Sequence, residues 1–255
     1  PLTGRTRTYR LFPVAIKELR TQNSRFELNQ KLNHFLLFGL YPEVIGLSSV
    51  SEKIELLREL TSSYLYKDVL QLSSIKHSDK IYRLLKMLAL QLGAPVSLHE
   101  IGQALEMSHN TVGNYIDLLE KGFVIFRLGG YSNNLRKEMN KMNKIYFYDL
   151  GIRNMLINNF NSLENRLDVG ALWENFLIVE RMKKLEYEPI FANSYFWRQY
   201  SGAELDYVEQ KDGQLFGFEF KYGKKKPKPP KSWLATYKEA SYQLVNRENY
   251  LDFIL

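Results

Sequence analysis

The sequence contains no cysteine, which excludes disulfide bonds and every cysteine-ligated zinc site. Its apolar runs are all shorter than the roughly 20 residues that a membrane-spanning helix needs. The opening residues, PLTGRTRTYRLF, have neither an initiator methionine nor the pattern of a signal peptide. We therefore expect a cytoplasmic protein with no membrane partner, whose N-terminus is cut from a longer chain.

Several catalytic motifs are missing as well. There is no G-x-S-x-G segment, and the four histidines show no metal-ligand spacing. No G-x-x-x-x-G-K-[ST] segment follows a strand. The nearest one, GFEFKYGKK at 217–225, has one residue too many and lacks the Ser or Thr that would bind Mg²⁺. We expect no ATP hydrolysis from this chain alone.

What the chain does contain is the composition of a folded protein, with 45% hydrophobic and 14% aromatic residues. At 255 residues it has room for one large domain or for about two to three small ones. The formal net charge of +7 favours an acidic partner, either nucleic acid or an anionic membrane surface.

The first block of the chain has the pattern of a strand followed by helices. The segment TRTYRLFPVAIKEL alternates apolar and polar residues up to Pro13, which predicts a strand that ends there and passes into a helix. Over residues 51–70, apolar side chains such as Leu57 and Leu60 recur at near-helical spacing and predict a helical region.

Residues 76–157 have the element order of a winged helix-turn-helix. After a first amphipathic helix, the segment Ser97 to Glu100 is a capping box that starts a second helix. Ser108 is placed to cap a third helix, which Gly122 ends. The strands FVIFRL and KIYFYDL follow, separated by the polar, basic loop GGYSNNLRKEMNKMNK.

The stretch NNFNSLENRLD, residues 158–168, has few apolar residues and predicts a linker. The last block, residues 165–255, alternates helix and strand patterns. It begins with the helix GALWENFLIVERMKKL and the strands EPIFAN and SYFWRQ, and it continues through a hairpin, a lysine-rich loop and a helix around Trp233 to Ala240. We expect a mixed α/β domain here.

The hairpin carries the candidate site. Asp212-Gly213 is a strong two-residue turn signal, and residues two apart in a strand share a face, so Glu219 and Lys221 project together. If the register permits, Asp206 on the other strand lies beside Glu219. Two carboxylates and a lysine that converge in this way predict a site for Mg²⁺ or Mn²⁺, with Lys221 orienting water or stabilising charge.

A further carboxylate, Glu174, stands early on the helix GALWENFLIVE and is placed to support this site. We predict Asp206, Glu219 and Glu174 as metal ligands and the same three residues with Lys221 as catalytic. The alternative is a solvated strand face with cross-strand ion pairs. On the residues alone, both interpretations stay open: a metal site, and a solvated strand face with cross-strand ion pairs.

The pattern of helical Glu174, then Asp206, then Glu219-Phe220-Lys221 resembles the PD-(D/E)xK nuclease superfamily. That resemblance implies an α/β domain that cuts phosphodiesters with a divalent metal ion. Applied to this chain, it implies a restriction-endonuclease-like domain over residues 165–255.

The wider chain resembles a bacterial and archaeal family of AAA-type ATPases. The segments that carry this resemblance include LTGRTRTYRLFPVAIKEL, FGLYPEVI, KIYFYDLGIRNML, FWRQYSGAELDYV and NRENYLDFIL. It implies that residues 1–75 are the tail of an ATPase core with its helical lid, that ATP binds only in the full-length protein, and that homo-oligomers form through the ATPase core. It also implies a C-terminus close to the natural one.

Cations and amides outside the carboxylate site predict contact with DNA. The segment KYGKKKPKPPKSW follows the Glu219 strand with six lysines and no acid, and it can neutralise phosphates without reading sequence. Within this loop, we predict Lys224, Lys225, Lys226 and Lys228 as contacts to DNA. On the third helix, Asn110 and Asn114 can meet base edges or phosphates. The wing cations are Arg127, Arg136, Lys137, Lys141 and Lys144, of which we predict Arg136 and Lys137 as contacts to DNA.

The function expected from the sequence is thus the C-terminal region of an AAA-type ATPase that binds DNA, with a Mg²⁺-dependent nuclease site in its last domain. Two alternatives stay open. The nuclease fold is inactive and holds DNA, or the chain is a protein-interaction module of the ATPase. The winged-helix block itself fits either DNA or protein contact, because its third helix also carries Asp117 and Glu120.

Overall fold

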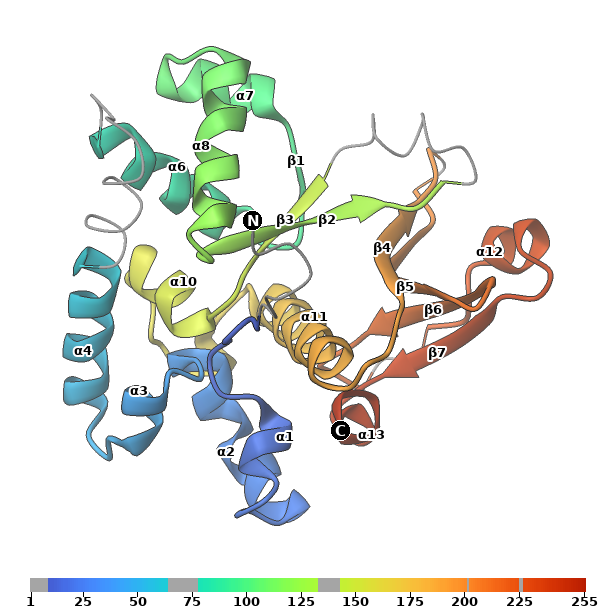
Figure 1. Ribbon diagram of the computed structural model, residues 1–255, viewed down its shortest axis with the longest axis horizontal. Helices are drawn as coiled ribbons and strands as arrows, with labels where there is room; N and C mark the ends of the chain where they lie inside the picture. Colours follow the sequence, from blue (N-terminus) through green and yellow to red (C-terminus); the bar gives the residue numbers. More distant parts are fainter. Residues whose placement is uncertain (1–8, 64–77, 133–142, 201, 225–226) are drawn as a thin grey trace, which may run out of the picture.

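The protein is described by a computed structural model that covers residues 9–63, 78–132, 143–200, 202–224 and 227–255. Within these ranges it is a mixed α/β structure of eleven α-helices and one seven-stranded sheet. Figure 1 shows most of the helices gathered beside the sheet, with one long helix between the two groups. None of the helices described is both long enough and apolar enough to cross a membrane.

The sheet combines antiparallel and parallel pairs. Its strands in chain order are β1 (Pro95–Val96), β2 (Ile125–Gly130), β3 (Asn143–Phe147), β4 (Asn193–Arg198), β5 (Glu204–Lys211), β6 (Gln214–Phe220) and β7 (Ser241–Val245). Across the sheet the order is β1-β3-β2-β4-β5-β6-β7, in which only β2–β4 and β6–β7 run parallel.

The helices of the first block are short or of medium length: α1 (Ile16–Leu19), α2 (Arg25–Phe38), α3 (Pro42–Gly46) and α4 (Val50–Ser63). Helix α4 agrees with the helical region predicted there, whose later residues 64–70 lie outside the described ranges. The strand predicted before Pro13 is wrong for its described part, because residues 9–12 are in no strand. Instead, the chain beyond Pro13 binds side chains of a helix: the Ile16 amide donates to Glu180 and Lys183 donates to the Val14 carbonyl.

The middle block has the predicted order of three helices and two strands. Its helices are α6 (Ser78–Leu90), α7 (Leu98–Leu105) and α8 (His109–Lys121), and β2 and β3 follow. Ser97 and Ser108 accept hydrogen bonds from backbone amides three residues later, and α8 ends at Gly122. Strand β1, which was not predicted, adds a third strand by pairing with β3.

The sheet does not stop at the predicted linker. Strand β2 of the middle block pairs with β4 of the last block through Gly129–Tyr195 and Gly130–Phe196. Helix α10 (Leu150–Leu156) and a 3-10 turn, η2 (Leu163–Asn165), lie between them in the chain. The domain limits at 157 and 165 therefore remain predictions, and one sheet runs through both blocks.

The stretch expected to be a linker is polar because it carries a buried ion network. The buried Arg166 side chain donates to both carboxylate oxygens of Asp168 and to the Asn154 side chain, and Arg153 also binds Asp168. A single acidic group thus pairs with two buried guanidinium groups, which ties residues 158–168 to the helical part of the protein.

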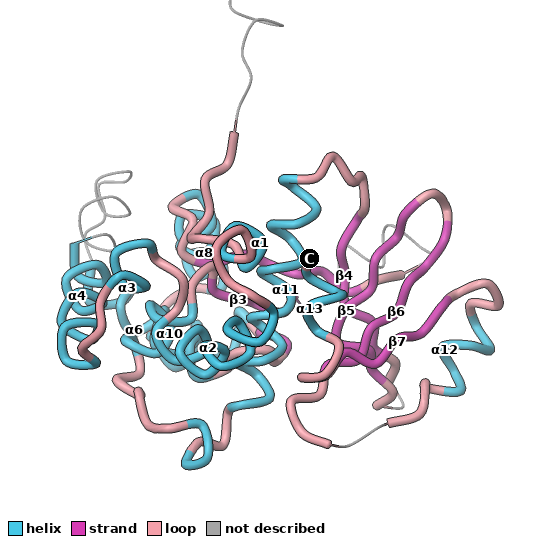
Figure 2. The backbone as a smooth tube through the Cα atoms, turned by 90° about the horizontal axis from the view of Figure 1, so that it is seen from below, coloured by secondary structure: helices cyan, strands magenta, loops and turns pink. Residues whose placement is uncertain are grey.

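The last block begins with the long helix α11 (Val169–Tyr187), continues through β4, β5 and β6, and ends with α12 (Lys231–Thr236), β7 and α13 (Tyr250–Ile254). The β5–β6 hairpin is confirmed: Asp212 and Gly213 form its turn with φ angles of 50° and 77°. The separate strand predicted over EPIFAN is wrong, since of those residues only Asn193 belongs to a strand. Figure 2 shows α13 close to the sheet and near the C-terminus.

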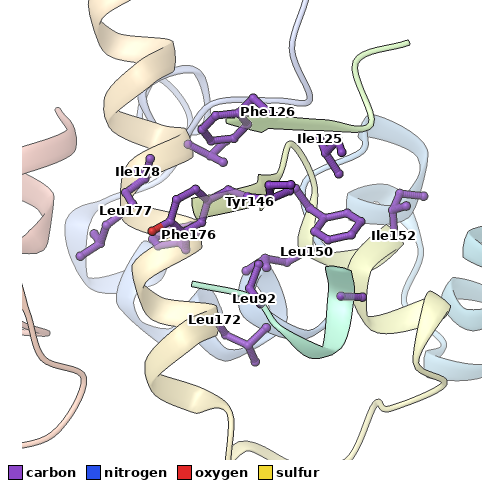
Figure 3. Packing of buried hydrophobic residues seen from close by; sticks show 14 of the residues in the cluster. Leu92, Ile125, Phe126, Tyr146, Leu150, Ile152, Leu172, Phe176, Leu177 and Ile178 are labelled. Carbon is purple, nitrogen blue, oxygen red and sulfur yellow. The ribbon is translucent and has the colours of Figure 1, made fainter. Parts of the chain in front are cut away.

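Helix α11 is the centre of the main core. Figure 3 shows Phe176 of this helix beside Tyr146, and Leu172 below Leu92, both partners coming from the middle block. On the sheet, Phe218 and Phe220 join the same core through Phe253 of α13. A smaller cluster around Trp197, Leu205 and Trp233 packs separately. One contiguous core thus links the helical part with the sheet.

Close packing within this core makes a specific glycine irreplaceable. A Cβ at Gly151 of α10 would lie 2.2 Å from the carbonyl oxygen of Phe38, whereas one at Gly170 of α11 would meet nothing within 4 Å. We expect Gly151→Ala to lower the free energy of unfolding by about 1–3 kcal/mol or more, because a backbone atom must move. Gly170→Ala, the matched control, should be neutral or stabilising by up to about 1 kcal/mol. Urea unfolding of both variants tests this, and equal midpoints would contradict the packing described here.

Candidate functional site

Three elements bring the four predicted catalytic residues together. Glu174 comes from α11, Asp206 from β5, and Glu219 and Lys221 from β6 and the residue that follows it. Glu174, Asp206 and Lys221 line an open pocket of about 370 Å³, and Glu219 is joined to them through Lys221. The sequence-based grouping is therefore present as a spatial cluster.

The hairpin register explains how its residues meet. The ladder between β5 and β6 ends at the pair of Tyr207 with Phe218, and Asp206 comes one position beyond it. The Asp206 Oδ2 atom accepts a hydrogen bond from the Phe220 amide at 2.7 Å, which fixes the carboxylate against β6. Lys221 Nζ lies 2.6 Å from Glu219 Oε1 and 4.0 Å from Asp206 Oδ2, so one ammonium group lies between the two carboxylates.

Glu174 is held from the other side by groups of the middle block. Its Oε1 atom accepts from the Tyr146 hydroxyl at 2.5 Å and from Lys144 Nζ at 3.0 Å. Gly93, which follows α6 with φ 75°, lies so close that a Cβ there would be 3.4 Å from Glu174 Oε2. The carboxylate is enclosed, with its side chain only 14% exposed.

Lys144 and Glu204 belong to this cluster, and sequence reasoning did not place either of them in it. Lys144 was predicted as an exposed wing cation for DNA, which is wrong: its side chain is 2% exposed and its Nζ lies 2.6 Å from Glu204 Oε1. The signal in the sequence is weak. Lys144 and Tyr146 are two apart on β3 and therefore share a face, but only the tertiary fold brings that face against Glu174.

Burial dominates the electrostatics of the carboxylates. It raises the pKa of Glu174 to about 7, with the Lys144 ammonium opposing the shift and the Asp206 carboxylate adding to it. Burial also raises the pKa of Asp206, against the hydrogen bond from the Phe220 amide and the charge of Lys221. The pKa of Glu219 is raised by burial first and by Asp206 second.

The two lysines respond in the opposite sense. Burial by itself would lower the pKa of Lys144, but the carboxylates of Glu174 and Glu204 outweigh it and raise that pKa above its usual value. Lys221 behaves in the same way beside Glu219 and Asp206. Four carboxylates therefore face two ammonium groups, and the Arg198 guanidinium lies 3.6 Å from Glu204 Oε2, which leaves an excess of one negative charge when all are ionised.

This donor set fits a hard divalent cation in chemistry and charge, since Mg²⁺ prefers carboxylate oxygens and the cluster has negative charge in excess. The residues that would hold it are Asp206 and Glu219, with Glu174 beside them. In the ranges that the structure describes, however, no three His, Asp or Glu side chains form a group that could hold a metal ion. The ammonium groups of Lys144 and Lys221 instead form ion pairs with Glu174 and Glu219.

The predicted DNA contacts have mixed outcomes. Asn110 and Asn114 are exposed on α8, and Lys224 and Lys228 are exposed after β6. Arg127 is not a free wing cation, because its guanidinium donates to Asp117 at 2.6 Å and to Glu120 at 2.5 Å. The remaining contacts lie outside the described residues: Arg136, Lys137, Lys141, Lys225 and Lys226.

Comparison with known proteins places the chain in a family. The family named domain of unknown function DUF8612 matches residues 29–163, which is more than half of the 255 residues. The chain belongs to the DUF8612 family. A second family, domain of unknown function DUF4143, matches residues 169–252 of the chain. This match begins at the first residue of α11. DUF4143 is found in AAA-ATPase-associated proteins.

Among curated proteins, an uncharacterized protein of Methanocaldococcus jannaschii is 26% identical to the DUF8612 chain over 208 residues, which is 74% of the chain and 45% of that protein. An uncharacterized protein of Haemophilus influenzae is 24% identical over 191 residues, 69% of the chain and 48% of that protein. The chain thus spans less than half the length of these two relatives. No solved structure matches it.

The raised pKa of Glu174 predicts a pH-dependent stability. Its folded value of about 7 lies above the ordinary value of 4.5, so the folded state binds a proton more tightly than the unfolded state does. The stabilisation from this proton is complete below pH 4.5 and is lost as the pH rises through about 7. Glu174→Gln stays neutral, so in EDTA it should gain stability relative to the parent across this interval.

The measurement is the free energy of unfolding of both proteins at several pH values between about 4.5 and 8, where the upper limit lies just above the folded pKa. The exposed Glu239, changed to Gln, serves as the control for the substitution itself. A difference between Glu174→Gln and the parent that stays constant with pH would contradict the buried, proton-binding carboxyl group.

Proposed function

We propose that this chain is the C-terminal region of an AAA-type ATPase, that it binds DNA, and that residues 165–255 form a PD-(D/E)xK-like domain with a Mg²⁺-dependent nuclease site. The observation that carries the proposal is the convergence of Glu174, Asp206 and Lys221 at one pocket, with Glu219 bound to Lys221. The match to a domain of AAA-ATPase-associated proteins supports the first part.

Each side chain has a role that follows from its contacts. Asp206 and Glu219 are the metal ligands, and Glu174 supports them from α11. The metal ion, when bound, polarises a phosphoryl oxygen and activates water. Lys221 is the most exposed of the four, with 35% of its side chain accessible, and it reaches the pocket from its ion pair with Glu219. It is placed to neutralise a phosphate oxygen or to orient the attacking water.

Two surfaces support DNA binding. Lys224 follows Gly223, which lines the pocket, so the lysine loop continues directly from the site, and Lys228 is exposed further along it. Lysines at this position would neutralise phosphates of a strand lying over the carboxylates. In the middle block, which we propose to be a winged helix-turn-helix, Asn110 and Asn114 are exposed on the third helix.

A second candidate function is favoured by Lys144. Its ammonium group binds Glu174 and Glu204, and no group of three potential metal ligands is assembled in the described part of the chain. An inactive nuclease fold that holds DNA, or that serves protein contacts of the ATPase, is compatible with this arrangement. Two experiments, one on DNA cleavage and one on DNA binding, separate these functions.

The first experiment tests cleavage. The purified chain is incubated with linear and branched DNA and with Mg²⁺ or Mn²⁺, beside Asp206→Asn and the control Asp212→Asn at the tip of the same hairpin. We expect cleavage by the parent and by Asp212→Asn, and a loss of at least about 100-fold in Asp206→Asn, because a ligand carboxylate is removed. Cleavage that survives in Asp206→Asn would place the activity elsewhere, and no cleavage by the parent would favour the second candidate.

The second experiment tests binding through the slope of log affinity against log salt concentration. Lys224, Lys225, Lys226 and Lys228 are changed together to Gln, with the same four changed to Arg as the charge-preserving control. Each lysine that contacts a phosphate of duplex DNA contributes about 0.9 to the slope, so the Gln variant should bind more weakly and with a shallower slope. An unchanged slope would show that these lysines do not contact DNA.

A further inference from the structure

Lys144 reaches the candidate site from outside the last block. It lies on β3, where the ladders pair it with Leu128 of β2 and with Pro95 of β1. Its side chain leaves this part of the sheet and ends among carboxylates of α11 and β5. Its ammonium group also lies 5.2 Å from the centre of the Phe196 ring, a cation–π contact that helps to fix its direction.

The cluster contains two lysines that each bridge two carboxylates. Lys221 lies between Glu219 and Asp206, at 2.6 and 4.0 Å. Lys144 lies between Glu174 and Glu204, at 3.0 and 2.6 Å. Each lysine thus lies between a pair of carboxylates, but the two lysines differ in exposure. The Lys221 side chain is 35% exposed, whereas that of Lys144 is only 2% exposed.

This difference in burial makes the two ammonium groups unequal. A buried charge is costly unless it is paired, and removing one partner of a buried pair leaves the other uncompensated. If Lys144 left its two carboxylates, its ammonium group would therefore remain buried without a partner. Lys221, by contrast, lines the open pocket. Glu174 is tied further by the Tyr146 hydroxyl, which donates to the same oxygen as Lys144.

We propose that Lys144 is a built-in cation that occupies the space between Glu174 and Glu204 and leaves only the Asp206–Glu219 side of the cluster open to a divalent ion. Lys144 is thus a positioning residue that limits the site to one metal ion. This inference rests on the proposed metal site. It also makes the site a joint product of the two blocks, because the middle block supplies the cation that the carboxylates of the last block require.

The test counts metal ions rather than activity. Binding of Mn²⁺ to the 255-residue chain is measured by calorimetry and by electron paramagnetic resonance of the free ion. The parent should bind one ion. Lys144→Met, whose unbranched side chain is one atom shorter and uncharged, should bind a second ion or bind the first at least about tenfold more tightly, because Glu174 and Glu204 lose the ammonium group that they share. Lys144→Arg keeps the charge and should bind as the parent does.

A second pair of variants covers the case in which Lys144→Met does not fold. Changing Lys144 to Met and Glu174 to Gln together removes both members of the buried pair, so neither leaves an uncompensated charge. This double variant is compared with Glu174→Gln alone, in which Lys144 remains on Glu204. We expect the double variant to bind Mn²⁺ at least about tenfold more tightly than Glu174→Gln.

The outcomes separate this inference from the proposed function. If the parent binds no Mn²⁺ and Lys144→Met does, the inference that one ion fits beside Lys144 is wrong, and the parent is not a metal-dependent nuclease. If the parent binds one ion and neither variant without Lys144 binds more or more tightly than its reference, the inference is wrong and the metal site stands. If no protein of the set binds Mn²⁺, the inference is also wrong.

Discussion

The ion pairs of the buried Lys144 with Glu174 and Glu204 are the contact on which the arrangement of the site depends. A lysine from β3, a glutamate from α11 and a glutamate from β5 meet there, with a single ammonium group between the two carboxylates. Removing one partner of the buried Lys144–Glu174 pair would leave the charge of the other without its partner. The group therefore fixes the relative position of three elements that are far apart in the sequence, and it does so at the wall of the pocket.

The rest of the fold keeps this contact in place. Helix α11 packs its apolar side chains against the middle block (Figure 3), and the parallel pairing of β2 with β4 extends one sheet across the chain. The buried network around Asp168 fixes the segment just before α11. As a result, the helix that carries Glu174 is held in a fixed position. The side of the cluster that is open to solvent is the one where Lys221 lies.

The features predicted correctly from the sequence are local ones. The Asp212-Gly213 turn determines the register of its hairpin, and that register places Asp206 near Glu219. The caps of α7 and α8 likewise depend on residues within one turn. Glu174 was proposed as a third carboxylate from its place early on its helix, and the resemblance supported this, because no local pattern links a helix to a strand about thirty residues away.

The errors have a common physical cause, which is that polar residues find partners through tertiary contacts. Lys144 and Arg127 have the sequence context of exposed wing cations, yet carboxylates on other elements bind both. Arg166 and Asp168 have the context of a solvated linker, yet they neutralise each other in the interior. The segment before Pro13 alternates like a strand, but side chains of α11 supply the hydrogen bonds of the residues that follow.

The most direct test of this account is the anomalous scattering of Mn²⁺ in crystals of the chain. The account predicts one anomalous peak, between Asp206 and Glu219, while the Lys144 ammonium group stays on Glu174 and Glu204. A peak between Glu174 and Glu204, with Lys144 displaced from them, would contradict it.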